Sequence, residues 1–165
     1  MQTLTHLEPI QTIVRLIEGI PTAMLTTLKD DGTLHSRPMA THAMELDGKI
    51  WFLASRSSRL VATILHHPQI NVGYAHPGRQ TYVSVTGTIA LVDDPERARA
   101  MWSPLFTTWF KNGYHDTDLA VLCVTIKHAD CWEPSGYPLP PPAGSQPAWV
   151  EGGSPTYDIN RRICL

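Results

Sequence analysis

Hydrophobic and polar residues alternate along the middle of the chain, most regularly over residues 80–92. One face of this run carries Thr81, Val83, Val85, Gly87, Ile89 and Leu91. A period of two residues predicts a β-strand that buries one face. Similar or continuously apolar runs predict five further strands, over residues 22–28, 33–46, 49–54, 69–75 and 119–126.

Tight-turn sequences separate the first three of these strands. One turn lies at residues 29–32 and ends in Gly32, and the other consists of Asp47 and Gly48. Glycine adopts the positive φ that hairpin turns need, so the three strands are expected to pair consecutively as an antiparallel meander.

Helical patterns occur in three places. Residues 8–18 carry apolar positions three and four residues apart, which predicts an amphipathic helix. The serine pair at 57–58 can cap a short helix that Pro68 terminates, and the Asp-Pro pair at 94–95 can begin a third helix.

These elements predict a mainly β domain. Short consecutive antiparallel strands close most easily into a small barrel, because closure removes exposed edges, so we expect six antiparallel strands in a barrel with peripheral helices. The composition changes at Pro134, where a proline-rich segment begins. Residues 1–133 are therefore expected to form the domain, and residues 134–165 an extended C-terminal tail.

Charge and composition limit the function classes. The chain has 13 basic and 15 acidic residues among 165, a formal charge of −2, so no overall field attracts nucleic acid or an acidic membrane. No leader sequence and no run of about 18 apolar residues is present, which indicates a cytoplasmic protein. The three cysteines and eight histidines show no metal-ligand spacing, so neither a disulfide framework nor a metal site is expected.

An anion site is the one candidate that the spacing itself suggests. If the strands fold about Asp47 and Gly48, Arg37 approaches Arg59 and the serines at 57–58, which begin a helix. Two guanidinium groups, two hydroxyls and a helix N-terminus suit a phosphate. The alternative is two solvated arginines beside an ordinary serine cap, and neither a P-loop nor a dinucleotide fingerprint is present to decide.

A set of motifs along the chain carries a family resemblance. They are Ser-Arg-Pro-Met at 36–39, Asp47-Gly48 with Trp51-Phe52, Ser57-x-Arg59, Tyr82-Val-Ser-Val-Thr-Gly87, Val92-Asp93-Asp94, Trp102, Trp109-Phe110, Asp116 with Asp118-Leu119, and Trp132. In this order, over about residues 8–133, they resemble the general stress protein branch of the pyridoxamine 5′-phosphate oxidase-like flavoproteins.

The resemblance implies a six-stranded split β-barrel that forms a homodimer and binds FMN in two clefts between the subunits. Arg37, Pro38 and Met39 would then lie along the flavin, Leu53 and Ala54 beside the ribityl chain, and Ser57, Ser58 and Arg59 around the phosphate. Tyr82 and Trp132 would contact the flavin from the partner chain or the cleft wall. Trp102, Trp109 and Phe110 suit the contact between subunits.

The implied function is that of a flavin-dependent oxidoreductase with a small-molecule electron donor or acceptor, in which FMN carries the hydride chemistry and Arg37 or His42 places charge beside it. The sequence does not identify catalytic residues. The alternatives are a non-catalytic protein that stores or senses flavin, and a split barrel that binds haem or a deazaflavin. Glu133-Pro134-Ser135-Gly136 stands where the oxidase has its Arg-Leu-His substrate segment, which argues against vitamin B6 phosphate oxidation.

Overall fold

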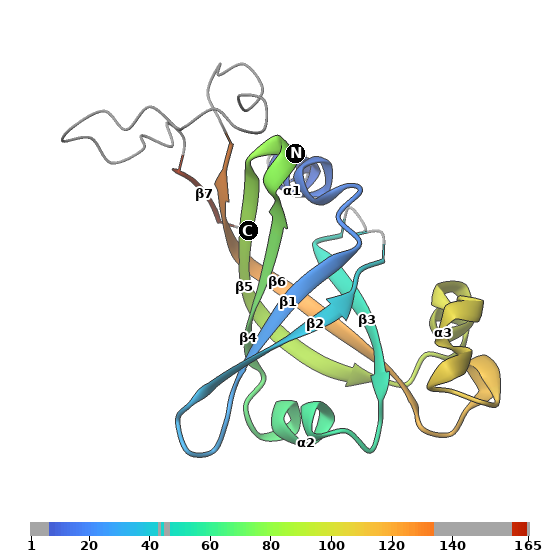
Figure 1. Cartoon of the computed structure of the whole chain (residues 1–165). Coiled ribbons are helices and arrows are strands. Elements are labelled where there is room, and N and C mark those ends of the chain that lie inside the picture. The colour runs from blue at the N-terminus through green and yellow to red at the C-terminus, as the bar shows by residue number, and fades with distance from the viewer. Residues whose placement is uncertain (1–6, 43, 45–46, 134–159, 165) are drawn as a thin grey trace, which may run out of the picture.

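The computed structural model describes residues 7–42, 44, 47–133 and 160–164. Within these residues, seven strands form one curled antiparallel sheet in the order β2-β1-β4-β5-β6-β3, with β7 paired to β6 (Figure 1). The strands are β1 (Thr22–Leu28), β2 (Leu34–Ala40), β3 (Lys49–Ser55), β4 (Gln69–His76), β5 (Thr81–Val92), β6 (Leu119–Trp132) and β7 (Asn160–Cys164). The fold is thus the mainly β half-barrel expected from the sequence.

Helices lie around the sheet. They are α1 (Leu7–Ile17), α2 (Arg59–His66) and α3 (Pro95–Met101), with short 3-10 turns η1 (Pro77–Arg79), η2 (Pro104–Thr108) and η3 (Gly113–His115). Figure 1 shows α1 and α2 at opposite ends of the curled sheet and α3 beside β3. The three α-helices predicted from the sequence are therefore present.

The expected pairing of the second strand with the third is wrong. Among the described residues, β2 pairs only with β1, about the confirmed turn at residues 29–32, while β3 pairs with β6 at the other end of the strand order. The two strands differ in burial: β2 is largely exposed, whereas Trp51 and Phe52 of β3 are buried on opposite faces and pack into the two cores. The Gly48 carbonyl also accepts a hydrogen bond from the Ile126 N–H, which draws this turn toward β6.

β7 was not predicted. It falls in the segment expected to be an extended tail, and its backbone pairs with the second half of β6. Residues 134–159, which hold the proline-rich stretch, lie outside the described residues.

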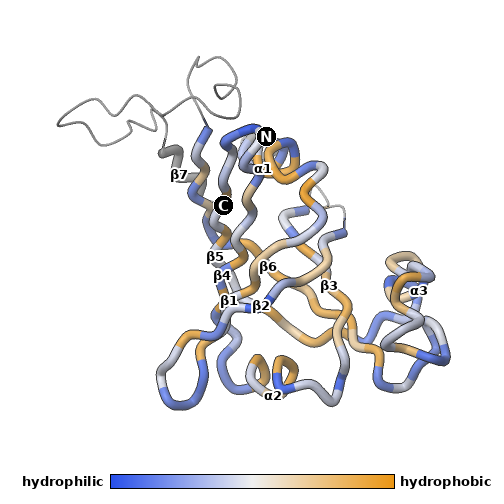
Figure 2. The backbone as a smooth tube through the Cα atoms, viewed as in Figure 1, coloured by the Kyte–Doolittle hydropathy of each residue, from blue (hydrophilic) through white to orange (hydrophobic). Residues whose placement is uncertain are grey.

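Two apolar clusters hold the fold together. Inward-facing strand residues such as Leu25, Phe52 and Val85 form the main core with the apolar faces of α1 and α2. A second core packs Trp51, Met101 and Phe110 with neighbours on the opposite face of β3 and β6. Figure 2 shows hydrophobic residues along much of β3 and β6, because each of these strands serves both clusters.

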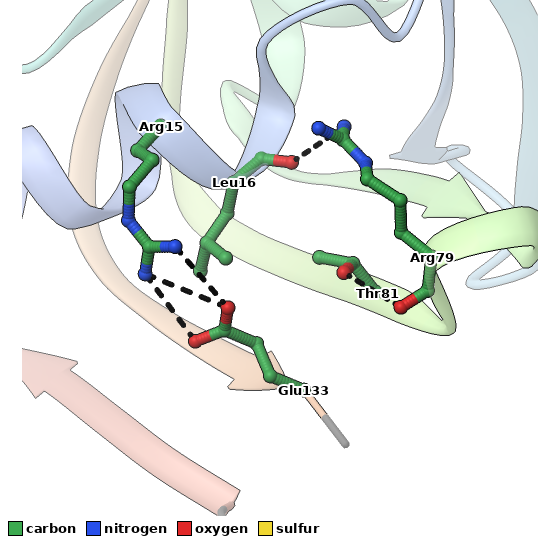
Figure 3. A network of polar contacts seen from close by, with 5 residues as sticks. All are labelled: Arg15, Leu16, Arg79, Thr81 and Glu133. Atoms are coloured by element: carbon green, nitrogen blue, oxygen red, sulfur yellow. Dashed lines mark hydrogen bonds and ion pairs between the residues drawn. The ribbon is translucent and has the colours of Figure 1, made fainter. Parts of the chain in front are cut away.

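Two arginines attach α1 to the strands (Figure 3). The Arg79 guanidinium donates to the carbonyls of Leu16 and Glu18 at 3.5 and 2.8 Å, which satisfies carbonyls that the end of a helix leaves free. Arg15 makes an ion pair with Glu133 at 3.4 Å, directly after β6. The N-terminal helix is thereby fixed over the end of the sheet where β6 ends.

A glycine permits the closest strand approach. The β5–β6 register shifts between Thr86 and Gly87, and a Cβ atom on Gly87 would overlap the backbone carbonyl oxygen of Thr125. Because the obstacle is backbone on a central strand, it cannot turn aside as a flexible side chain would.

We therefore expect Gly87→Ala to lower the free energy of unfolding by roughly 2–4 kcal/mol. Gly73→Ala is the matched control, since a Cβ there meets its nearest atom, the Met24 carbonyl oxygen, at 3.9 Å. Urea unfolding of both variants measures the difference. Equal, small losses would contradict the steric account of the bulge.

Candidate functional site

The N-terminus of α2 carries three of the predicted phosphate residues. Ser58 is the N-cap, and its hydroxyl oxygen accepts from the Val61 N–H at 3.3 Å while its own proton remains available to donate. Arg59 begins the helix with an exposed side chain, and in the described part of the chain its guanidinium makes no hydrogen bond or ion pair. These donors and the first N–H groups of the helix all belong to the N-terminal end of α2, where a helix leaves backbone N–H groups without intrahelical partners.

Ser57, also exposed, belongs to a polar network that sequence reasoning missed. Asp118 accepts a hydrogen bond from the Ser55 hydroxyl and another from the Ser57 N–H, the latter at 2.8 Å. The Ser55 hydroxyl bond, followed by the Ser57 N–H bond, holds the pKa of Asp118 below its usual value of 3.8. Asp118 follows Ser57 by 61 residues, so only the fold shows that they meet.

Arg37 lies on the inner side of β2 and has an incompletely satisfied guanidinium. Its Cα pairs with that of Leu25, whose side chain lies in the main core. Nη2 contacts His35 Nδ1 at 2.8 Å, whereas the buried Nη1 has no hydrogen-bond partner. Since guanidinium only donates, His35 must offer the lone pair of Nδ1, a pairing that the sequence did not reveal.

The other predicted residues of β2 and β3 alternate between faces. Met39 and Ala54 pack against the main core, whereas Leu53 packs against the second core and Pro38 is exposed. Leu53 and Ala54 therefore cannot both present side chains to one ligand. β2 and β3 end the strand order and lie beside one another, so each has a backbone edge without a strand neighbour in that order (Figure 1).

His42 follows β2 and is half-buried beside η2. Its ring centroid lies 5.9 Å from that of Phe106, and its buried Nε2 has no hydrogen-bond partner among the residues that the structure describes. Burial lowers the pKa of His42 from its usual 6.5, so the imidazole is neutral at pH 7. Burial also lowers the pKa of Arg37, but its guanidinium keeps its charge.

Tyr82 and Trp132 form a separate group. They are direct cross-strand neighbours and project from the outer face of β5 and β6, where both are half-buried. Leu119, which pairs with Ser55, lies at the opposite end of β6, on the order of 40 Å away along the strand. One chain thus separates the predicted site into a phosphate half and an aromatic half.

A cavity of about 270 Å³ lies on another side of the β3–α2 loop. Arg56, Asp93, Asp94, Tyr114 and Asp116 are among its lining residues. It contains none of the predicted cofactor residues. Asp94 and Asp116 also accept backbone N–H groups, from Arg97 and Asp118 respectively, which gives both carboxylates a structural role.

Two further observations concern metal-binding groups and membrane-spanning helices. In residues 7–42, 44, 47–133 and 160–164, no three His, Cys, Asp or Glu side chains come together as a metal-binding group. None of the helices in that part of the chain has the length and apolar character that crossing a membrane requires.

The curled antiparallel sheet, with β2 and β3 at the two ends of its strand order, is consistent with a split β-barrel, and the N-terminus of α2 is its candidate anion site. The chain belongs to the pyridoxamine 5′-phosphate oxidase like family, whose sequence model matches residues 8–152. This confirms the family resemblance.

Solved structures show the same fold. A general stress FMN/FAD binding protein from Xanthomonas citri is 26% identical with a TM-score of 0.66, over 81% of this chain and 94% of that chain. General Stress Protein 26 from Bacillus anthracis is 21% identical with a TM-score of 0.65, over 75% and 91%. A protein related to general stress protein 26 from Clostridium acetobutylicum is 18% identical with a TM-score of 0.66, over 76% and 89%. Comparison with curated proteins gave no match.

The neutral His42 has a consequence for stability. Its pKa is lower in the folded protein than in the unfolded chain, so the unfolded chain binds a proton first as the pH falls below about 6.5. His42 therefore lowers stability at acidic pH and has no such effect above that range. We expect His42→Phe, which keeps a ring beside Phe106, to lose less stability than the wild type between pH 7.5 and 5.5.

Urea unfolding at the two pH values measures this difference. His115→Phe is the control, because His115 is exposed and also contacts a ring, that of Tyr114, with centroids 4.1 Å apart. If His42→Phe and the wild type lose the same stability on acidification, the neutral buried state of His42 is refuted.

Proposed function

We propose that this protein is a flavoprotein that binds FMN between two copies of the chain and acts as an oxidoreductase. The observation that carries the proposal is the N-terminus of α2, where the exposed Arg59 side chain, the Ser58 N-cap hydroxyl and the first N–H groups of the helix belong to successive residues. Guanidinium, hydroxyl and helix dipole together suit a phosphate better than a carboxylate on a neighbouring surface side chain.

The split between β2 and β3 supports the position of the flavin ring. In the described part of the chain, the buried Arg37 Nη1 on β2 and the buried His42 Nε2 just after β2 lack hydrogen-bond partners, and β2 and β3 lie beside one another at the two ends of the strand order. A planar heterocycle with carbonyl oxygens and ring nitrogens can satisfy such groups. The Xanthomonas citri protein, 26% identical, is described as FMN/FAD binding, which supports a flavin at the corresponding place.

Arg37 has the electrostatic role in this proposal. FMN supplies hydride chemistry when it is bound, and reduction leaves negative charge on the ring. Because His42 is neutral at pH 7, the cation near this position is Arg37. His35 fixes the Arg37 guanidinium through Nη2 and leaves Nη1 directed away from that contact.

We expect Arg59→Ala to weaken FMN binding by about ten- to a hundredfold, since a charge-assisted hydrogen bond contributes roughly 1.5–3 kcal/mol. Riboflavin, which lacks the phosphate, should bind the variant and the wild type equally. Titration of flavin-free protein with both ligands gives the two affinities.

Arg56→Ala is the matched control, because Arg56 is equally exposed but lines the separate cavity. Equal loss of FMN and riboflavin would mean that Arg59 shapes the site without binding the phosphate. The absorbance spectrum of the purified protein distinguishes FMN from haem or a deazaflavin, and reduction of the bound flavin by NADH or NADPH distinguishes an enzyme from a storage protein.

The dimer follows from the two separated halves of the site. Tyr82 and Trp132 project from the outer face, beside half-buried polar residues such as Asn71 and Ser84, whose side chains are hydrogen-bonded at 2.7 Å. Met24 on the same face is 45% exposed. Phe110 is buried in the second core of its own chain, so Trp109, at 71% exposure, is the remaining candidate of that pair for contact between subunits.

We expect mixed dimers to restore binding that two single variants lose. Each proposed cleft combines Arg59 of one chain with Trp132 of the other. A dimer of either variant, Arg59→Ala or Trp132→Ala, therefore has two damaged clefts. A mixed dimer has one cleft with both substitutions and one cleft with neither. Random exchange at equal amounts should make about one quarter of all clefts intact. Flavin titration before and after exchange measures this fraction. A monomeric mass with FMN bound, or no recovery after verified exchange, would contradict the shared cleft.

A further inference from the structure

One residue holds the whole loop that leads into the proposed phosphate site. The Asp118 carboxylate accepts from the Ser55 hydroxyl and, at 2.8 Å, from the Ser57 N–H, while its backbone carbonyl accepts from the Arg56 N–H at 2.6 Å. Three successive residues, the last of β3 and the first two of the loop to α2, are thus hydrogen-bonded to a residue that directly precedes β6.

Asp118 is itself held in place. Its N–H donates to Asp116 Oδ1 at 3.0 Å, and Asp116 Oδ2 accepts from the Asn112 N–H at 3.2 Å. The next residue, Leu119, pairs with Ser55 across the β3–β6 ladder. The loop is therefore anchored to the central strand of the sheet, and the position of the helix end follows from that anchor.

The hydrogen bonds around Asp118 have a defined direction. An ionised carboxylate only accepts, and hydrogen bonds from Ser55 and Ser57 keep the pKa of Asp118 low. The single Ser55 hydroxyl proton is directed to Asp118, so the 3.1 Å contact between Ser55 Oγ and Ser57 Oγ must use the Ser57 proton. A rotation of the Ser57 hydroxyl alone would redirect that proton to a ligand.

We infer that Asp118 is a positioning residue for the flavin phosphate, and that its hydrogen bonds, rather than its charge, perform this role. The inference rests on the proposed function. The carboxylate does not contact the phosphate; it fixes Ser57 and the start of α2, which do. Its negative charge opposes an anion beside the loop, so the role inferred for the carboxylate is to supply two acceptor oxygens that face two donors, the Ser55 hydroxyl and the Ser57 N–H.

Two substitutions separate hydrogen bonding from charge. Asp118→Asn and Asp118→Ala both remove the charge, but asparagine can accept from the Ser57 N–H and donate to Ser55 Oγ, which reverses the hydroxyl chain and frees the Ser57 proton. We expect Asp118→Asn to bind FMN at least as tightly as the wild type. Asp118→Ala should bind FMN about tenfold more weakly than Asp118→Asn, and riboflavin should bind all three proteins equally.

Titration of the flavin-free proteins with FMN and riboflavin tests this, with Asp93→Ala, an exposed nearby carboxylate, as the control. Amide hydrogen exchange without flavin adds a second measurement: the Ser57 N–H should be protected in the wild type and in Asp118→Asn, and should exchange faster in Asp118→Ala.

Equal FMN affinity of the asparagine and alanine variants would overturn the inference, as would an equal loss of FMN and riboflavin in Asp118→Ala. Failure of the proposed function has a different result, because wild-type protein would then show no preference for FMN over riboflavin.

Discussion

The structure depends on the backbone pairing of one long strand, β6. Its first half lies between β3 and β5, and its second half lies between β5 and β7. Because β6 takes β3 as its neighbour, β2 is left with β1 alone, and the sheet curls with β2 and β3 as facing edges. The bulge at Gly87, which lets β5 approach Thr125 closely, is part of the same constraint.

The pairing of β6 also determines where functional groups can meet. Leu119, its first residue, and Asp118, directly before it, anchor the loop that carries the proposed anion site, through the hydrogen bonds of Asp118 and the pairing of Leu119 with Ser55. Its last described residue, Trp132, lies beside Tyr82 at the far end. The two groups are rigidly separated within one chain, so a second copy is the simplest way for both to line one cleft. The shared cleft and the flavin remain the proposal that this geometry supports.

Local signals in the sequence predicted most of the elements. The alternation in residues 80–92 predicted β5, the serine pair predicted the cap of α2, and the turn at 29–32 predicted the β1–β2 hairpin, all of which the structure contains. Such signals depend on residues that are close in sequence. The Asp47-Gly48 turn was a good turn signal as well, but it did not specify the strand partner, which burial of Trp51 and Phe52 decided.

Contacts between segments that lie far apart in the sequence could not be predicted from such local signals. Asp118 belongs to one of the motifs that carry the family resemblance, but its hydrogen-bond partners Ser55 and Ser57 lie 63 and 61 residues away in the sequence. His35, two residues before Arg37, gave no signal because its role depends on the direction of the Arg37 side chain. The residues of the proposed anion site could be suggested from the helix cap, whereas the groups that orient them required the fold.

A crystal structure of the flavin complex tests the central claim most directly, because it assigns each contact to a chain. The account predicts that the phosphate contacts Ser57, Ser58 and Arg59 of one copy while Tyr82 and Trp132 of the other copy contact the same flavin. A flavin bound wholly within one chain, or a phosphate bound away from the N-terminus of α2, would contradict it.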